Sequence, residues 1–105
     1  MNKIALEIIA LSSSVTQLQS YAVVLGEVGG ERRLPIVIGS FEAQSIAVAL
    51  EQINPSRPLT HDLMTNLMQS FSIQLVEVVI YRLSEGIFYA NLICERDGEK
   101  MEIDS

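Results

Sequence analysis

The stretch IQLVEVVIYRLSEGIFYANLICERDGEKMEID, residues 73–104, decides the fold. Two short turn signals, SEG and RDGE, divide it into three runs rich in apolar, β-branched and aromatic residues. Runs of this kind between Gly-containing turns are typical of strands, so the sequence predicts strands over 73–83, 87–95 and 100–104. The links are too short for crossover connections, and the three strands should therefore pair as two antiparallel hairpins.

The N-terminal part of the chain carries a similar pattern. Alternation of apolar residues predicts three strands, at 3–11, 21–28 and 32–38. The Gly29–Gly30 pair should form the hairpin between the last two of them. Pro35 favours an edge position or an irregularity for the third strand, because proline cannot donate a ladder hydrogen bond. We expect SSSVTQLQS, residues 12–20, to be a polar connection.

Two helices are predicted between these sets of strands. Apolar residues recur at helical spacing over 40–53, with Ser40 as the N-cap, and from Thr60 to about Phe71, with Thr60 as the N-cap. The order βββααβββ predicts an α+β fold with a largely antiparallel sheet and the helices packed on it. The likeness of the two halves predicts a duplicated strand-strand-strand-helix unit, whose second helix would follow Ser105. We therefore expect residues 1–105 to form a single domain that is incomplete at its C-terminus.

The strands of the second half carry apolar residues on both faces if their side chains alternate strictly. Val78 and Ile80 would then lie on one face, and Val79 and Tyr81 on the other. An antiparallel sheet with one wet face should instead show polar residues at every second position. The helices can cover one face, so we expect a partner subunit, as in a homodimer, or a further segment to cover the other.

The charge balance restricts the partners of the protein. The chain of 105 residues has 13 acidic and 7 basic residues, which gives a net charge of −6. Non-specific binding to polyanions depends on Lys and Arg displacing counterions, so this balance opposes it. A phosphate site in this chain would need a metal ion or a local basic patch.

The cysteine content and the hydropathy pattern indicate the compartment. The single cysteine, Cys94, excludes an internal disulfide and fits a reducing compartment. Glu7 interrupts the apolar N-terminal run, which argues against a signal peptide. No apolar run approaches the ~20 residues that a membrane helix needs. We therefore expect a cytoplasmic protein with no membrane segment, and a buried, inert Cys94.

The segment RPLTHDLM, residues 57–64, contains the only histidine of the chain. A purely structural interpretation accounts for it. Thr60 caps the second helix, Asp62 is favoured by the positive end of the helix dipole, and Pro58 stiffens the approach. Nothing in this interpretation requires a function.

A functional interpretation uses the same geometry. A helix N-terminus offers free N–H groups to an anion, and Arg57 can grip a phosphate with two donors. His61 is a candidate general base, and Asp62 is a candidate ligand of a divalent cation. Glu42 begins the first helix and Asp104 ends the last strand, so these carboxylates are candidates to converge on the site. No G-x-S-x-G, H-E-x-x-H, zinc-ligand or Gly-rich phosphate motif is present.

Three segments, LPIVIGSFEAQSIAVAL, RPLTHDLM and FYANLICERDGEKMEIDS, together resemble the bifunctional nuclease domain family. That family comprises small bacterial proteins and plant relatives described as acting on RNA and DNA. The resemblance spans residues 3–105 and implies a dimer with an α+β sheet core. A further Arg-Pro-Ser-Asp-Ala block of the family does not occur up to Ser105. The family pattern falls on Leu34, Pro35, Ile36, Ile38, Gly39, Glu42, Ala43, Arg57, Pro58, Thr60, His61, Asp62 and Asp104.

Two hypotheses of different classes follow. The first is a metal-assisted nuclease that hydrolyses phosphodiester bonds of RNA or DNA. In it, His61 and Asp62 are catalytic, Arg57 and Thr60 bind substrate, and Mg²⁺ or Mn²⁺ is held by three carboxylates, those of Asp62, Asp104 and Glu42. The second is a non-enzymatic, dimeric binding or interaction module, which explains the low charge and the apolar strands without any chemistry.

Overall fold

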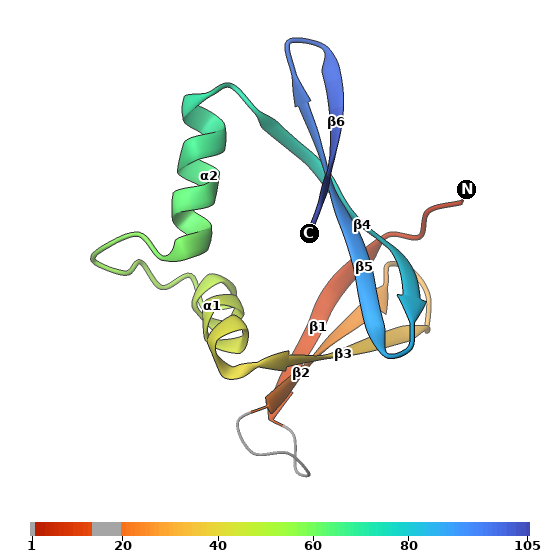
Figure 1. Ribbon diagram of the computed structural model, residues 1–105. Coiled ribbons are helices and arrows are strands. Elements are labelled where there is room, and N and C mark those ends of the chain that lie inside the picture. The colour runs from red at the N-terminus through yellow and green to blue at the C-terminus, as the bar shows by residue number, and fades with distance from the viewer. Residues whose placement is uncertain (1, 14–19) are drawn as a thin grey trace. The chain divides into compact units, whose positions relative to one another are not determined.

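The computed structural model describes residues 2–13 and 20–105 and confirms the predicted order of elements (Figure 1). The described residues form two three-stranded antiparallel sheets and two helices, which is an α+β fold. The elements are β1 (Leu6–Ser13), β2 (Ser20–Glu27), β3 (Arg33–Gly39), α1 (Ser40–Leu50), α2 (Thr60–Ser70), β4 (Gln74–Ser84), β5 (Ile87–Arg96) and β6 (Glu99–Asp104).

The chain divides into two compact units, residues 1–56 (unit 1) and residues 57–105 (unit 2). Unit 1 holds the sheet β1-β2-β3 and α1, and unit 2 holds α2 and the sheet β4-β5-β6. Each sheet is an antiparallel meander in chain order, as the likeness of the two halves predicts. Most of the expected polar connection at 12–20 lies outside the described residues.

A β-bulge sets the faces of the sheet in unit 1. Register is lost between Ile8 and Ala10, so Ile9 has no partner on β2. A bulge interrupts the two-residue alternation, and Leu11 therefore joins Leu6 and Ile8 on one face. The alternation assumed for residues 3–11 was wrong at this point. The apolar face that results is formed by Leu6, Ile8, Leu11, Tyr21, Val23, Leu25, Leu34, Ile36 and Ile38.

Small residues allow close packing within unit 1. A Cβ on Gly26 would overlap the side chain of the bulged Ile9, so glycine makes room for the bulge. Helix α1 contacts β2 and β3, and its Ala43 is buried together with Val23 of β2. β3 lies at the sheet edge, which confirms the position predicted from Pro35.

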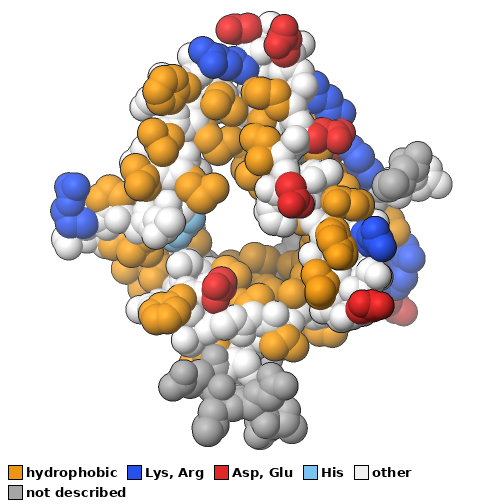
Figure 2. All heavy atoms as spheres, viewed as in Figure 1, with side chains coloured by type: hydrophobic (Ala, Val, Ile, Leu, Met, Phe, Trp, Pro, Cys, Tyr) orange, Lys and Arg blue, Asp and Glu red, His pale blue; other side chains and the backbone are white. Residues whose placement is uncertain are grey.

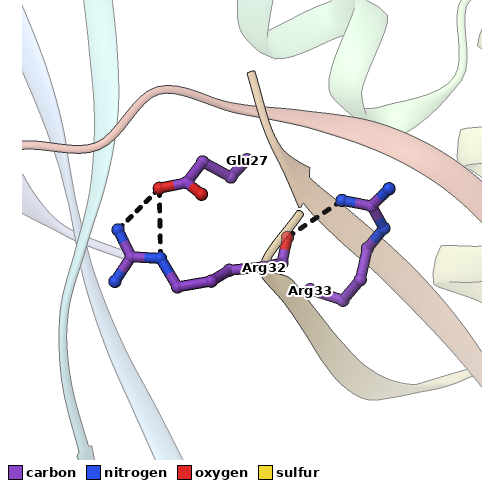
Figure 3. A network of polar contacts seen from close by, with 3 residues as sticks. All are labelled: Glu27, Arg32 and Arg33. Atoms are coloured by element: carbon purple, nitrogen blue, oxygen red, sulfur yellow. Dashed lines mark hydrogen bonds and ion pairs between the residues drawn. The ribbon is translucent and has the colours of Figure 1, made fainter. Parts of the chain in front are cut away.

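A charged network closes the β2–β3 hairpin (Figure 3). Arg32 donates from Nε and Nη2 to Glu27 Oε2, at 3.1 and 2.6 Å, and Arg33 Nη1 donates to the Arg32 carbonyl at 3.1 Å. The Glu27 backbone N–H also donates to the Arg32 carbonyl, at 3.0 Å. The side-chain hydrogen bond from Arg32 holds the pKa of the Glu27 carboxyl below its usual value. The Arg32–Arg33 pair is thus tied to its own hairpin.

The strands of unit 2 are joined by two tight turns. Ser84 pairs with Ile87, and Arg96 pairs with Glu99, so each turn has two residues between paired strand ends. Both residues of each turn have positive φ: 53° and 78° at Glu85–Gly86, and 51° and 79° at Asp97–Gly98. These are type I′ turns, in which glycine avoids the strain of the left-handed region. The two hairpins predicted from SEG and RDGE are confirmed.

Two bulges in β4 correct the expectation of two apolar faces in unit 2. Register shifts leave Val76 and Tyr81 without partners on β5. Directly opposed residues lie on the same face, so the register defines two faces. We call one the apolar face. Its groups of directly opposed residues are Leu75–Cys94–Met101, Val78–Leu92–Ile103, Ile80–Ala90 and Leu83–Phe88. The other is the mixed face. Its groups of directly opposed residues are Gln74–Glu95–Lys100, Glu77–Ile93–Glu102, Val79–Asn91–Asp104, Arg82–Tyr89 and Ser84–Ile87.

Burial in unit 2 is confined to the central strand. Ile93 and Cys94 of β5 are 5% and 0% exposed, which confirms that Cys94 is buried. On the apolar face, Leu75, Val78 and Leu83 remain exposed, and hydrophobic side chains are prominent on the visible surface (Figure 2). Helix α2 also exposes an apolar stripe, formed by Leu63, Met64 and Leu67 with Phe71 just beyond its last turn. Neither α1 nor α2 is long and apolar enough to cross a membrane, within the described part of the chain.

Candidate functional site

The candidate site is the N-terminus of α2. Thr60 is the first helical residue, and Leu59 is the N-cap, with extended backbone at φ −79° and ψ 173°. The prediction of Thr60 as the N-cap was therefore wrong by one residue. Asp62 is the reason, because its Oδ2 accepts the Leu59 backbone N–H at 2.9 Å. An acidic residue at the third helical position makes this bond with the residue three places earlier.

Helix α1 also has an acidic residue at its third position, but among the described residues the carboxylate accepts no hydrogen bond. The N-cap is Gly39, so the prediction of Ser40 was also wrong by one residue. Glu42 occupies the third helical position, and a Cβ on Gly39 would overlap the Glu42 carboxylate. The carboxylate is thus folded back toward the helix start, where the positive end of the dipole favours it. Glycine at position 39 leaves the space for it.

His61 and Asp62 form the only pair that the structure brings together from the predicted site residues, among the residues it describes. His61 Nε2 lies 3.4 Å from Asp62 Oδ1. The side chains are 44% and 40% exposed, so solvent and a ligand can reach them. Thr65 Oγ1 donates to the Asp62 carbonyl at 2.9 Å, one turn further along the helix. Asp62 therefore uses one carboxylate oxygen on the backbone and offers the other to His61.

Arg57 and Thr60 lie beside this pair in the chain. Arg57 is in the bend before the helix, Thr60 is at its first position, and both are exposed. Within the described part of the chain, the Arg57 guanidinium makes no hydrogen bond or ion pair with a side chain, so its donors remain available to an anion. The first-turn N–H groups of α2 are the second source of donors, because they have no acceptor within the helix.

The other two predicted carboxylates lie on other elements of the chain. Asp104 is at the end of β6, exposed and opposite Asn91 on the mixed face. Glu42 belongs to unit 1, whereas Asp62 and Asp104 belong to unit 2. Among residues 2–13 and 20–105, no group of three or more His, Cys, Asp or Glu side chains is arranged to hold a metal ion. The set of Asp62, Asp104 and Glu42 stays a prediction.

A second cluster in unit 2 was not found from the sequence. Tyr81, Arg82 and Tyr89 gather where β4 and β5 pair, next to the bulge at Tyr81. Strict alternation along β4 places Tyr81 and Arg82 on opposite faces, which hides the cluster. An aromatic residue next to an arginine was the available signal, but it indicates a common surface only when the bulge is known.

This α+β chain, with a His–Asp pair at the start of its second helix, can be assigned to a family. The model of the bifunctional nuclease domain matches residues 23–105, and the chain belongs to that family. The match includes all of unit 2 and most of the described residues of unit 1, and it confirms the family indicated by the sequence motifs.

Two relatives from Mycobacterium tuberculosis are similar to this chain. They are "Uncharacterized protein MT1877" of strain CDC 1551 / Oshkosh and "Uncharacterized protein Rv1829" of strain ATCC 25618 / H37Rv. Each is 44% identical over 92 residues, which is 87% of this chain and 56% of the relative. The chain thus spans little more than half the length of the relatives it matches. Their names state no activity.

Proposed function

We propose that the protein hydrolyses phosphodiester bonds of RNA or DNA at the N-terminus of α2. The observation that carries the proposal is the approach of His61 Nε2 to Asp62 Oδ1, at 3.4 Å, on an exposed helix start. Membership in the bifunctional nuclease domain family supports the substrate class. A histidine beside a carboxylate is a common arrangement for a general base.

The role of Asp62 in this proposal is to position His61. The Leu59 N–H holds Oδ2, which fixes the carboxylate, and Oδ1 then faces Nε2. A carboxylate opposite Nε2 favours the tautomer that carries its proton there. Nδ1 is left with its lone pair and accepts the proton of a water molecule as the water oxygen bonds to phosphorus. The P–O bond to the leaving nucleotide oxygen breaks, and that oxygen takes a proton from the protonated His61 or from solvent. His61 is the catalytic residue, and Asp62 is a positioning residue.

Substrate phosphate would bind beside this base. The free N–H groups of the first turn of α2 point along the helix axis and carry partial positive charge. Arg57 adds up to two charge-assisted hydrogen bonds from the preceding bend. Thr60, at the first helical position, adds a hydroxyl donor. These local donors offset the net charge of −6, which otherwise repels a polyanion.

The described residues do not fit a preassembled metal centre. Asp62 Oδ2 is occupied by the Leu59 N–H and Oδ1 faces His61, so a cation would have to compete for these oxygens. Mg²⁺ needs few protein ligands because it keeps waters and binds substrate phosphates. A bound Mg²⁺ or Mn²⁺ would therefore be held mainly by waters and the substrate phosphate, and it would neutralise phosphate charge there.

The test is cleavage of labelled single-stranded RNA and DNA by the purified chain, beside a His61→Ala variant prepared identically. Cleavage that is lost in the variant, with an unchanged circular dichroism spectrum, supports the proposal. Equal cleavage by both proteins would show that the activity comes from a contaminant or from another site. Identical preparation matters because trace nucleases are common in purified proteins.

A second candidate function is a dimeric interaction module without catalysis. The exposed residues of the apolar face favour it, since Leu75, Val78 and Leu83 are 43%, 53% and 57% exposed. Large exposed apolar patches mark interaction sites more often than free surface. Sedimentation equilibrium distinguishes the two functions when combined with the cleavage assay. A dimer with no turnover on either nucleic acid would favour the module.

A further inference from the structure

The cluster of Tyr81, Arg82 and Tyr89 in unit 2 has the geometry of a stacking site. The Arg82 guanidinium carbon lies 5.1 Å from the centre of the Tyr89 ring. The rings of Tyr81 and Tyr89 have their centres 6.3 Å apart and are inclined by 48°. A cation within about 6 Å of a ring centre is attracted by the ring quadrupole. Arg82 therefore makes a cation–π contact with a half-buried tyrosine.

The bulge at Tyr81 produces this arrangement. Ile80 pairs with Ala90 and Arg82 pairs with Tyr89, so Tyr81 is the extra residue of β4. Two residues of β4 thus oppose one residue of β5, and both of their side chains meet Tyr89. Without the bulge, successive side chains would point to opposite faces of the sheet. Bulges often redirect side chains next to functional sites.

The cluster is accessible. Tyr81 is 44% exposed, Arg82 is exposed, and Tyr89 is half-buried beneath them. The mixed face continues from Arg82–Tyr89 with Ser84–Ile87 on one side and Val79–Asn91 on the other. These neighbours are uncharged. The acidic residues of this face, Glu77, Glu95, Glu102 and Asp104, follow further along the strands or on β6.

We propose that this cluster binds an unpaired base of a single-stranded nucleic acid. The base stacks on the open side of the Arg82 guanidinium or on the Tyr81 ring, and Arg82 is also available to the adjacent phosphate. Single-stranded binders use aromatic rings and arginine planes in this way. The nucleic-acid class of the ligand rests on the proposed function, but binding at this cluster requires none of the residues at α2.

Binding by stacking is compatible with the negative net charge of the protein. The net charge of −6 argues against binding by counterion release, but a base presents an uncharged π face to the cluster. The cluster contains one cation, Arg82. Each phosphate contact on a single strand contributes a slope of about −0.7 to the dependence of log affinity on log salt. We therefore expect a shallow salt dependence, together with a clear preference for single strands over duplex.

The experiment is fluorescence anisotropy of a labelled oligothymidylate of about 10 nucleotides, and of the matching duplex, with the full chain in EDTA. EDTA suppresses contaminating metal-dependent nucleases during the measurement, and intact probe is checked on a gel. Tyr81→Leu removes the exposed ring, and we expect binding of the single strand to weaken roughly 5- to 100-fold. Tyr81→Phe keeps the ring and should bind like the wild type. Thermal melting of each variant shows that it is folded.

Arg82→Lys separates stacking from charge. It keeps the positive charge but loses the planar guanidinium, so we expect a weaker affinity with an unchanged salt slope. Arg96→Lys is the matched control, because it makes the same chemical change on the same sheet. Arg96 lies on the same side of β5 as Cys94 and therefore on the apolar face, whereas Arg82 lies on the mixed face. The control should bind like the wild type.

The outcomes separate this inference from the proposed function. Wild-type affinity in Tyr81→Leu and Arg82→Lys, or no binding of the single strand by the wild type, would overturn the stacking site. Weakened binding in both, with the two controls unaffected, supports it. Cleavage that depends on His61 while all stacking variants bind normally would leave the proposed function intact and remove this inference. Binding that depends on Tyr81 without any cleavage would do the reverse.

Discussion

The two helix starts of the molecule have the same backbone layout and differ most in chemistry at the second helical position. In both α1 and α2 the N-cap residue is extended and an acidic residue, Glu42 or Asp62, stands at the third helical position. The second position is Phe41 in α1 and His61 in α2. An acid at the third position is therefore a structural feature that needs no function. What sets α2 apart is the histidine beside it, 3.4 Å from the carboxylate.

The largest expected effect on cleavage is that of replacing His61, at the second position of α2. His61→Ala should lower cleavage of single-stranded RNA or DNA by roughly 10²- to 10⁴-fold, the usual contribution of a general base. Phe41→Ala is the control at the matching position of α1, where the side chain is 82% exposed. Initial rates on a labelled substrate measure both. An equal loss in the two variants would mean that the helix starts do not differ in function.

The next largest effect on cleavage is that of replacing Asp62, at the third helical position, which is acidic in both helices. Asp62→Asn keeps an oxygen for the Leu59 N–H but removes the charge that faces His61, and we expect a loss of about 10- to 100-fold. The loss should fall on kcat, with KM nearly unchanged, because Asp62 acts through His61. Glu42→Gln, the matched change in α1, should leave both constants unchanged. A strong loss in Glu42→Gln would instead revive the predicted carboxylate set for a metal.

Removal of divalent cations should have a smaller effect than His61→Ala. The oxygens of Asp62 are already engaged, and the described residues form no group of three metal-binding side chains. We expect EDTA at constant ionic strength to reduce cleavage by less than about tenfold, through weaker phosphate binding. Rates with EDTA, Mg²⁺ and Mn²⁺ test this. Complete loss in EDTA, restored by either ion, would establish metal-dependent cleavage.

The same comparison has a consequence for stability. Asp62→Ala removes the acceptor of the Leu59 N–H and should destabilise the protein by about 1 kcal/mol, the usual cost of a lost cap. Glu42→Ala should cost less, because among the described residues its carboxylate accepts no hydrogen bond and contributes mainly through the dipole. Urea denaturation of the two variants measures the difference. Equal losses would show that hydrogen bonding at the third position is irrelevant here.

The order of elements was predictable because tight turns and helical spacing are local signals. SEG and RDGE carry the glycines that type I′ turns need, and both hairpins formed where the sequence placed them. The helix starts were each misplaced by one residue, at Ser40 and Thr60. Hydroxyl side chains are preferred N-caps, whereas an acid two residues after each of them marks the preceding residue as the N-cap. The acid decides, since its carboxylate bonds the backbone of the N-cap residue in α2.

The faces of the sheets were not predictable from alternation. The bulges at Ile9, Val76 and Tyr81 each shift the pattern by one residue, and their positions depend on pairing between strands. Two apolar faces were therefore expected where the structure has one apolar and one mixed face. The same shift hid the cluster around Tyr89. The pair of His61 and Asp62 was recognised because it lies within one helical turn, whereas Asp104 and Glu42 require long-range placement.

The smallest expected effect is that of replacing Glu27, which forms an ion pair with Arg32 in unit 1. Hydrogen bonding from Arg32 lowers the folded-state pKa of Glu27 below its ordinary value of 4.5. A lowered folded pKa stabilises the protein above the unfolded value, and this contribution is lost as pH falls through the folded pKa. Glu27→Gln should therefore reduce melting temperature slightly near neutrality and not at strongly acidic pH, because the pair is exposed to solvent. Cleavage near neutral pH should not change. A melting temperature that Glu27→Gln lowers equally at neutral and at strongly acidic pH would contradict this assignment.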